Sequence, residues 1–205
     1  MDLSRPFSGI SPGVEADVLV VLAGAETRRT GREISRVSGR SATGVQHALE
    51  RLVEEGLVHR ERAGRAHLYS LNREHLLAPV VEVMAGVRWE LVQRLRAQIG
   101  GWKIPTFHAS LFGSAARGDG NARSDLDLLV VRRADIDPEE KVWSQQLSDL
   151  AERVLEWTGN HAGIVEIAEA DISSLLEERP PVLQEVLDQG IDLAGTPIRR
   201  WAQSR

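Results

Sequence analysis

The chain contains no cysteine, which excludes disulfide bridges and metal sites built from thiolates. None of its apolar runs approaches the roughly 20 residues that a helix needs to span a bilayer. Residues 1–13 also lack the apolar stretch of a secretory signal. These absences predict a cytoplasmic protein that does not contact a membrane. Hydrophobic residues make up 42% of the chain and charged residues 27%, as expected of a globular fold.

Charge is unevenly distributed along the 205 residues, whose formal net charge is −5. Between residues 28 and 67 there are nine arginines against five glutamates. The part after residue 76 carries fourteen basic residues against twenty acidic ones, and it also holds all five tryptophans. This change of composition near the middle of the chain predicts two domains.

Residues 30–72 contain the signals of two short helices followed by two strands. Thr30 and Glu33 have the spacing of a capping box, which predicts a helix, and Gly39 is suited to end it. Ser41 can cap a second helix, in which apolar residues recur at intervals of three and four. Further along, the segments LVHRER and AHLYSL predict a two-stranded ribbon around an Ala-Gly-Arg turn.

This order of elements, with a further helix expected in VEADVLVVLAGA, resembles the winged helix-turn-helix family over about 60 residues. In that family the second helix of the motif enters the DNA major groove. The resemblance implies that residues 1–75 form a domain that binds double-stranded DNA. The implied DNA-binding residues are Arg40, Ser41, Thr43, Gln46, His47 and Arg51 on that helix, with Arg62 and Arg65 in the wing. A small domain that binds protein or only dimerises is the alternative.

Residues 76–101 are predicted to form a connecting helix, because apolar residues recur along them at helical spacing. Pro79 fits the first turn of such a helix, and Gly100 with Gly101 is suited to end it. The same apolar stripe suits a helix packed on its own domain and a helix that pairs with its copy. We expect a homodimer.

The segment LFGSAARGDGNARSDLDLLVV, residues 111–131, places ten residues between a Gly-Ser pair and two aspartates. Because side chains alternate along a strand, Asp125 and Asp127 are expected on one face, close enough to share metal ions. Like charges held together are unfavourable unless cations neutralise them. Carboxylate oxygens at this spacing suit Mg²⁺ or Mn²⁺. Gly113 would let a phosphate approach the backbone, and N–H groups after Ser114 would attract anions.

This arrangement resembles the nucleotidyltransferase superfamily that includes DNA polymerase beta-like enzymes, whose signature is Gly-Ser, about ten residues, and Asp-x-Asp. The flanking segments resemble the minimal nucleotidyltransferases of prokaryotes, and the resemblance runs from about Phe107 to the end of the chain. It implies a domain over residues 102–205 with a mixed sheet flanked by helices, and therefore an α+β chain of two domains. The implied nucleotide-binding residues are Gly113, Ser114, Arg117 and Ser124, and the implied catalytic and metal-binding residues are Asp125, Asp127 and a third acid. Arg117 is expected to steady the turn through Asp119 or to reach a phosphate.

The third carboxylate of the family lies on a later strand, for which HAGIVEIAEADI, residues 161–172, is the candidate. Glu166 fits best as the third catalytic and metal-binding residue, with Glu169 and Asp171 as fallbacks. Here the sequence departs from the family pattern, because glutamate is one methylene longer than the usual aspartate. The other interpretation of Glu166 is an exposed acid on an edge strand.

The resemblance implies an enzyme that uses Mg²⁺ or Mn²⁺ to transfer a nucleoside monophosphate, in the first instance AMP from ATP, to an acceptor hydroxyl. Small transferases of this type often accompany toxins and modify them, so the resemblance also implies a protein acceptor such as a toxin and an autoregulated operon. The alternative is a transcriptional regulator whose nucleotidyltransferase-like domain is inactive and senses nucleotide or mediates dimerisation. The irregular third acid motivates that alternative.

Overall fold

The computed structural model describes residues 1–198 and 200, and its contacts divide the chain into two compact units. One unit is Arg5–Arg88, and the other joins Met1–Ser4 to Trp89–Arg205. Residues 199 and 201–205, which the sequence prediction assigns to the second domain, lie outside the described residues. Within the described part, none of the helices has both the length and the hydropathy that crossing a bilayer requires.

The unit Arg5–Arg88 combines helices with a small antiparallel sheet. Its elements in chain order are α1 (Val14–Ala23), β1 (Arg29–Thr30), α2 (Gly31–Ser38), α3 (Ala42–Glu54), β2 (Val58–Ala63), β3 (Ala66–Leu71) and α4 (Ala78–Ala85). Strands β2 and β3 form the expected hairpin, and the short strand β1, which the sequence did not suggest, pairs with β3. Helix, short helix, turn, helix and ribbon therefore follow one another as predicted.

Local hydrogen bonds explain where the helices of this unit begin. Thr30 Oγ1 accepts a hydrogen bond from the Glu33 backbone N–H at 3.3 Å, and Glu33 Oε2 accepts one from the Thr30 N–H at 2.7 Å. Ser41 Oγ accepts one from the Gly44 N–H at 3.2 Å and so caps α3. Gly39, with a φ of +66°, ends α2 in the left-handed conformation that glycine tolerates best. These predicted start and stop signals are confirmed.

The segment predicted as a connecting helix is two helices that end and begin around Gly86. Helix α4 has Pro79 in its first turn and buries Val81 in the core of the first unit. Helix α5 (Val87–Gly100) buries Leu95 in the core of the second unit. The apolar stripe along residues 76–99 is therefore divided between two separate cores, which explains its length.

The second unit is built on a four-stranded mixed sheet of order β6-β5-β4-β7. Its elements after α5 are β4 (His108–Phe112), α6 (Gly113–Arg117), β5 (Leu126–Arg132), α7 (Lys141–Thr158), β6 (Ala162–Ala168), the short 3₁₀ helix η1 (Glu169–Asp171), α8 (Ile172–Glu178), α9 (Pro181–Gln189) and β7 (Ile191–Gly195). Strand β4 is antiparallel to β5 and β7, whereas β5 and β6 are parallel. The prediction of an α+β chain with a mixed sheet is confirmed.

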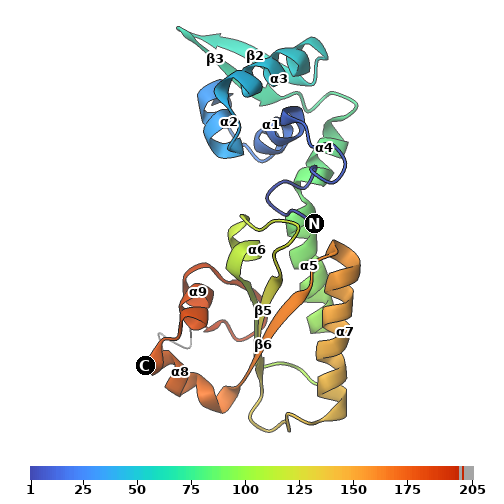
Figure 1. The fold of residues 1–205 in the computed structure, drawn as a ribbon, viewed down its shortest axis with the longest axis vertical. Coiled ribbons are helices and arrows are strands. Elements are labelled where there is room, and N and C mark those ends of the chain that lie inside the picture. Colours follow the sequence, from blue (N-terminus) through green and yellow to red (C-terminus); the bar gives the residue numbers. More distant parts are fainter. Residues whose placement is uncertain (199, 201–205) are drawn as a thin grey trace. The chain divides into compact units, whose positions relative to one another are not determined.

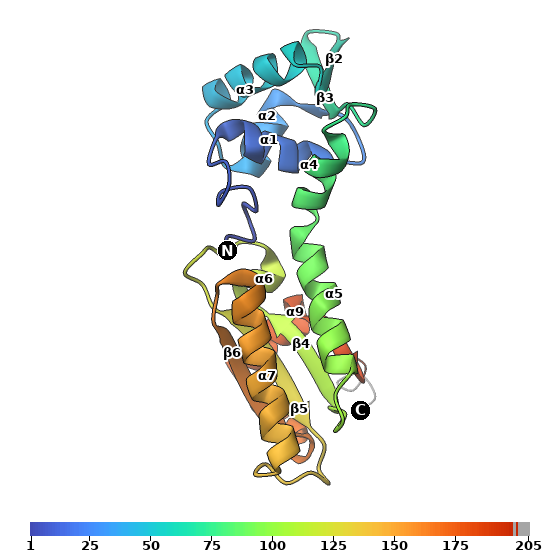
Figure 2. The ribbon, with the colours of Figure 1, turned by 90° about the vertical axis from the view of Figure 1, so that its right-hand side faces the viewer.

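The two faces of this sheet are covered by different helices, as Figures 1 and 2 show. On one face, Leu126 and Leu128 of β5 share a buried cluster with residues of α5 and with Leu150 of α7. On the other face, Leu129 and Val131 share a buried cluster with residues of α8 and α9. Because side chains alternate along β5, Asp127 lies on the same face as Leu129, on the side of α8 and α9.

Candidate active site and DNA-binding surface

The Gly-Ser turn lies directly beside the second aspartate of the pair. Phe112, the last residue of β4, is the register partner of Asp127 on β5. Gly113 then has a φ of +65°, and a Cβ at this position would overlap the Asp127 carboxylate. Glycine is therefore required here for two reasons, the backbone conformation and the close approach of the carboxylate.

A compact loop follows this turn. The Ser114 carbonyl accepts hydrogen bonds from the backbone N–H groups of Gly118, Asp119 and Gly120, at 2.9, 3.1 and 3.2 Å. A Cβ on Gly120 would lie 2.8 Å from Ser114 Oγ, so the loop packs against the Ser114 side chain. The Gly-Ser turn therefore lies against Asp127, and the loop after it closes over Ser114.

Asp127 is the second residue of β5 and is half-buried, whereas Asp125 precedes the strand and is exposed. Burial raises the pKa of Asp127, and the negative charges of Asp125 and Glu185 raise it further, while Arg117 lowers it. The neighbouring acids therefore disfavour the ionised form of Asp127, and a cation bound between Asp125 and Asp127 would relieve that repulsion.

Arg117 connects this site to helix α9. Its Nε lies 3.1 Å from Asp119 Oδ2, which is one of the two roles expected for it, and its Nη1 lies 3.7 Å from Glu185 Oε2. Sequence reasoning missed Glu185, because it lies on an amphipathic helix far along the chain and no pattern marks it. The fold brings it near the aspartates by packing α9 against α6 and β4.

Glu166 does not join Asp125 and Asp127, contrary to the prediction for the third acid. In the parallel pairing of β5 with β6, Glu166 is the register partner of Val130, so it lies on the face opposite to Asp127. There its Oε1 accepts hydrogen bonds from Arg132 Nε at 2.9 Å and from Trp143 Nε1 at 3.0 Å. The strand register therefore contradicts the position expected for Glu166. Its hydrogen bonds instead join β6 to β5 and to helix α7.

The β6 residue beside Asp127 is Gly163. A Cβ at this position would lie 3.2 Å from Asp127 Oδ1 and 4.0 Å from Asp125 Cβ. The next residue on the same face of β6 is Val165, whose register partner is Leu129. The strand therefore offers no carboxylate on the face that carries Asp127, and the described residues contain no group of three or more acidic or histidine side chains arranged to hold a metal ion.

The two fallback acids also lie elsewhere. Glu169 Oε2 accepts a hydrogen bond from the Ala134 backbone N–H at 3.1 Å, after the far end of β5. Asp171 closes the short helix η1 and lines a cavity together with Glu166 and Arg132. Because β6 runs parallel to β5, residues after β6 lie at the end of the sheet away from Asp127.

Ser124 shapes the loop before the aspartates. Its Oγ accepts a hydrogen bond from the Asn121 backbone N–H at 3.1 Å, and its carbonyl accepts one from Asn160 Nδ2 at 2.8 Å. Asn160 is buried and also donates to the Asn121 carbonyl at 3.2 Å. Sequence reasoning missed Asn160, because a single asparagine after a helix-ending glycine usually signals only a turn.

The first unit exposes most of the residues predicted to contact DNA. Side chains of Thr43, Gln46 and His47 are exposed on α3, and Arg62 and Arg65 are exposed in the wing. Gln46 Nε2 donates to Glu50 Oε1 at 2.8 Å, a contact on the solvent side that DNA could replace.

Three of the predicted residues have structural partners instead. Arg40 Nε lies 2.5 Å from Oδ2 of the buried Asp17, and Arg51 Nη1 lies 2.5 Å from Glu15 Oε1, so both guanidinium groups bind acids of α1. Ser41 uses its hydroxyl to cap α3. The sequence predicted the cap by Ser41, but it could not show that α1 brings acidic partners to Arg40 and Arg51.

Comparisons with known proteins agree with this division. Residues 9–73 match the family described as sugar-specific transcriptional regulator TrmB, and residues 90–182 match the nucleotidyltransferase domain family. No curated protein matches the chain.

Some solved structures are similar to the chain at low identity. A mutant of ZitR from Lactococcus lactis is 22% identical, covering 68% of this chain and 73% of that chain, with a TM-score of 0.34. A toxin-antitoxin structure with AMP-PNP is 24% identical over 57% of this chain and 78% of that chain, with a TM-score of 0.34. A mutant MntA-HpeT toxin-antitoxin is 21% identical over the same shares, 57% and 78%, with a TM-score of 0.33. The two family matches show that this chain carries a TrmB-type winged-helix DNA-binding domain followed by a nucleotidyltransferase domain.

Proposed function

We propose that this protein is a cytoplasmic transcriptional regulator that binds double-stranded DNA and holds a nucleoside triphosphate in its nucleotidyltransferase domain without transferring it. The observation that carries the proposal is the register of β6, which puts Gly163 beside Asp127 and turns Glu166 to the other face. The site then keeps the Gly-Ser turn and the two aspartates but has no third carboxylate on that strand face. Such a site suits binding of a nucleotide better than activation of an attacking hydroxyl, which needs a base near its proton.

The residues fit a divalent cation that arrives with the nucleotide. Asp125 and Asp127 supply hard oxygen donors. The negative charge of Asp125 contributes to the raised pKa of Asp127, and a bound Mg²⁺ or Mn²⁺ ion would offset that charge. With two carboxylates from the protein, phosphate oxygens and water would complete the coordination of the ion. When bound, the ion would neutralise the triphosphate, for which ATP is the first candidate.

The protein's own groups would orient the phosphates. Gly113 leaves the backbone open where a side chain would overlap Asp127, and the loop around Ser114 and Ser124 forms the adjacent wall. Arg117 is within 3.7 Å of Glu185, and its guanidinium can exchange that exposed partner for a phosphate. Exchange of this ion pair would connect nucleotide binding to helix α9.

Replacing Asp127 by asparagine is expected to weaken Mg²⁺-dependent binding of ATP by about 30-fold or more, because one of two charged ligands to the cation is lost. Titration calorimetry with and without Mg²⁺ measures this. Asp135→Asn is the matched control, since Asp135 is an exposed acid paired with Arg133 after the same strand. Equal ATP binding by wild type and Asp127→Asn would contradict the proposed site.

The affinity for the cation should also depend on pH in a defined direction. Protonation of Asp127 competes with the cation, and its pKa is raised above the ordinary value of 3.8 by burial and by Asp125. As pH falls, the affinity for Mn²⁺ should therefore decrease. This decrease should begin at a higher pH than for a site whose aspartate has an ordinary pKa.

Transfer of a nucleoside monophosphate to an acceptor hydroxyl, including one on a protein such as a toxin, is the second candidate function. The spacing of Gly113 and Ser114 before Asp125 and Asp127 favours it. Release of pyrophosphate from ATP in the presence of candidate acceptors, lost in Asp127→Asn, would establish transfer and replace the first candidate. ATP binding that changes the affinity for DNA from upstream of the gene, with no pyrophosphate released, supports the regulator.

We further propose that the regulator is a homodimer. Helix α4 exposes Val80 and Val83 on one face, with 54% and 73% of their surfaces accessible, and Leu76 in the turn before the helix is 93% exposed. A second copy is the expected occupant, because winged-helix and related readers commonly bind two half-sites as symmetric dimers. Val80→Glu with Val83→Glu should convert the dimer to a monomer in light scattering, whereas a monomeric wild type would exclude the dimer.

A further inference from the structure

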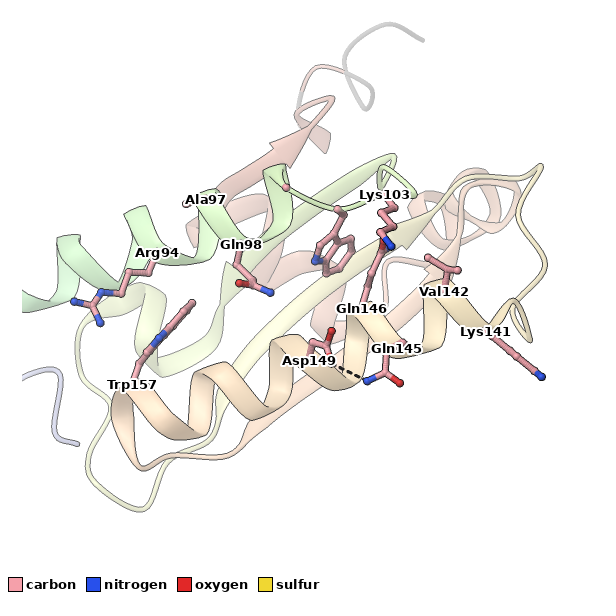
Figure 3. A pocket seen from close by; sticks show the side chains of 12 residues that line it. Arg94, Ala97, Gln98, Lys103, Lys141, Val142, Gln145, Gln146, Asp149 and Trp157 are labelled. Carbon is pink, nitrogen blue, oxygen red and sulfur yellow. Dashed lines mark hydrogen bonds between the residues drawn. The ribbon is translucent and has the colours of Figure 1, made fainter.

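A groove between α5 and α7 contains both lysines of the chain. Among the 25 basic residues the only lysines are Lys103 and Lys141. They are separated along the sequence, yet both line the same cavity of about 770 Å³. Both side chains are exposed, and neither ammonium group forms an ion pair within the described residues. Figure 3 shows them toward one end of the groove.

The rest of the groove offers aromatic and amide groups and one acid, Asp149, which accepts a hydrogen bond from Gln145 Nε2 at 2.7 Å. Trp102 and Trp157 both line it, and the Arg94 guanidinium lies over the Trp157 ring, 5.9 Å from its centroid. Figure 3 places Arg94 and Trp157 at the end of the groove opposite to the lysines, and Gln98 lies between the two ends. The indole N–H of Trp102 is buried with no acceptor among the described residues.

Position separates this groove from the nucleotidyltransferase site. The helices that form it, α5 and α7, cover the sheet face of Leu126 and Leu128, whereas Asp127 lies on the face of α8 and α9. None of the residues that line the groove is Gly113, Ser114, Asp125 or Asp127. A ligand could therefore occupy it while a nucleotide is bound to the aspartates.

We propose that this groove binds a small ligand that carries a phosphomonoester on a ring. Arginine outnumbers lysine strongly in this chain, and lysine provides a compact, mobile charge suited to a phosphate. Indole rings provide flat surfaces for the ring of a ligand, and Gln98 provides polar contacts to its hydroxyl or amide groups. The volume lies within the range of small-molecule sites. A sugar phosphate and a nucleoside monophosphate share this chemistry.

Lysine acetylation of the full chain tests the proposal, because mass spectrometry need follow only two side chains. Saturating glucose 6-phosphate or AMP, tested separately, should slow acetylation of both Lys103 and Lys141 by about fivefold or more, which distinguishes the two sources. Inorganic phosphate lacks the ring and glucose lacks the phosphate, so each should protect the two lysines from acetylation far less. Protection that persists in Asp127→Asn assigns the ligand to the groove.

A binding measurement on variants completes the test. Ligand titration followed by tryptophan fluorescence should show affinity reduced about tenfold or more in Lys103→Gln with Lys141→Gln, since two charges are lost. Arg153→Gln is the matched control, because Arg153 is an exposed cation of α7 paired with Glu156 and does not line the groove. Absence of protection by both ligands, equal protection by inorganic phosphate, or unchanged affinity of the double variant would each overturn the proposal.

Discussion

Replacing Gly163 by aspartate is expected to raise the affinity of the protein for Mn²⁺ in the absence of nucleotide by about tenfold or more. The new carboxylate would stand beside Asp127, where a Cβ has room at 3.2 Å from Asp127 Oδ1 after a small adjustment. A third charged oxygen ligand adds electrostatic attraction for the ion and offsets the repulsion between the existing acids. Loss of the free Mn²⁺ signal in electron paramagnetic resonance titrations measures the affinity.

Glu166→Gln separates this prediction from the one that the sequence suggested. Glu166 faces Arg132 and Trp143, so the variant should leave Mn²⁺ affinity unchanged and lower the melting temperature instead. Val165→Asp places a carboxylate further along the same face of β6 and serves if Gly163→Asp does not fold. Weaker Mn²⁺ binding by Glu166→Gln, with no gain from either aspartate, would restore Glu166 as the third ligand.

Removing both wing arginines, Arg62→Ala with Arg65→Ala, is expected to lower the affinity for DNA about 10- to 100-fold at low salt. Two lost phosphate contacts should also reduce the slope of log affinity against log salt by about 2. Both side chains are exposed at the tip of the hairpin, Arg62 near the end of β2 and Arg65 in the turn before β3, where a wing meets the DNA backbone. Gel shifts with DNA from upstream of the gene, at several salt concentrations, measure both quantities.

Arg51→Ala provides the matched control on α3. Its guanidinium already binds Glu15, so its loss should change DNA affinity less than about threefold, as for an offset surface charge. By contrast, Thr43→Ala with Gln46→Ala should reduce the preference for one sequence over another, because these exposed groups suit base edges. A larger loss from Arg51→Ala than from the wing variant would place the DNA on a different surface.

Some features of this protein could be predicted from short stretches of sequence because their physical causes are local. The capping box of Thr30 and Glu33 and the cap by Ser41 are made by groups three residues apart. The Gly-Ser turn directly follows β4, and the aspartates lie at the start of the adjacent antiparallel strand β5, so their spacing was sufficient to bring them together.

Contacts between distant segments could not be predicted in the same way. Arg40 and Arg51 looked like DNA-binding residues until α1 supplied Asp17 and Glu15 as their partners. Gly86 divides an apolar stripe that appeared continuous, because each half packs in a different core. Glu185 entered the candidate site only because α9 packs against α6.

The sequence by itself determined the order of the elements, the two kinds of domain and the place of the aspartate pair. Only the tertiary structure decided whether a third acid joins that pair, because this depends on the register of β6 against β5. Side chains alternate between the faces of a strand, so a shift of one residue would move Glu166 to the other side of the sheet. The apolar residues around Glu166 occupy both faces of β6 and left that register unspecified. The pairing of Asp127 with Gly163 fixes it, and Glu166 is consequently a partner of Arg132 and Trp143.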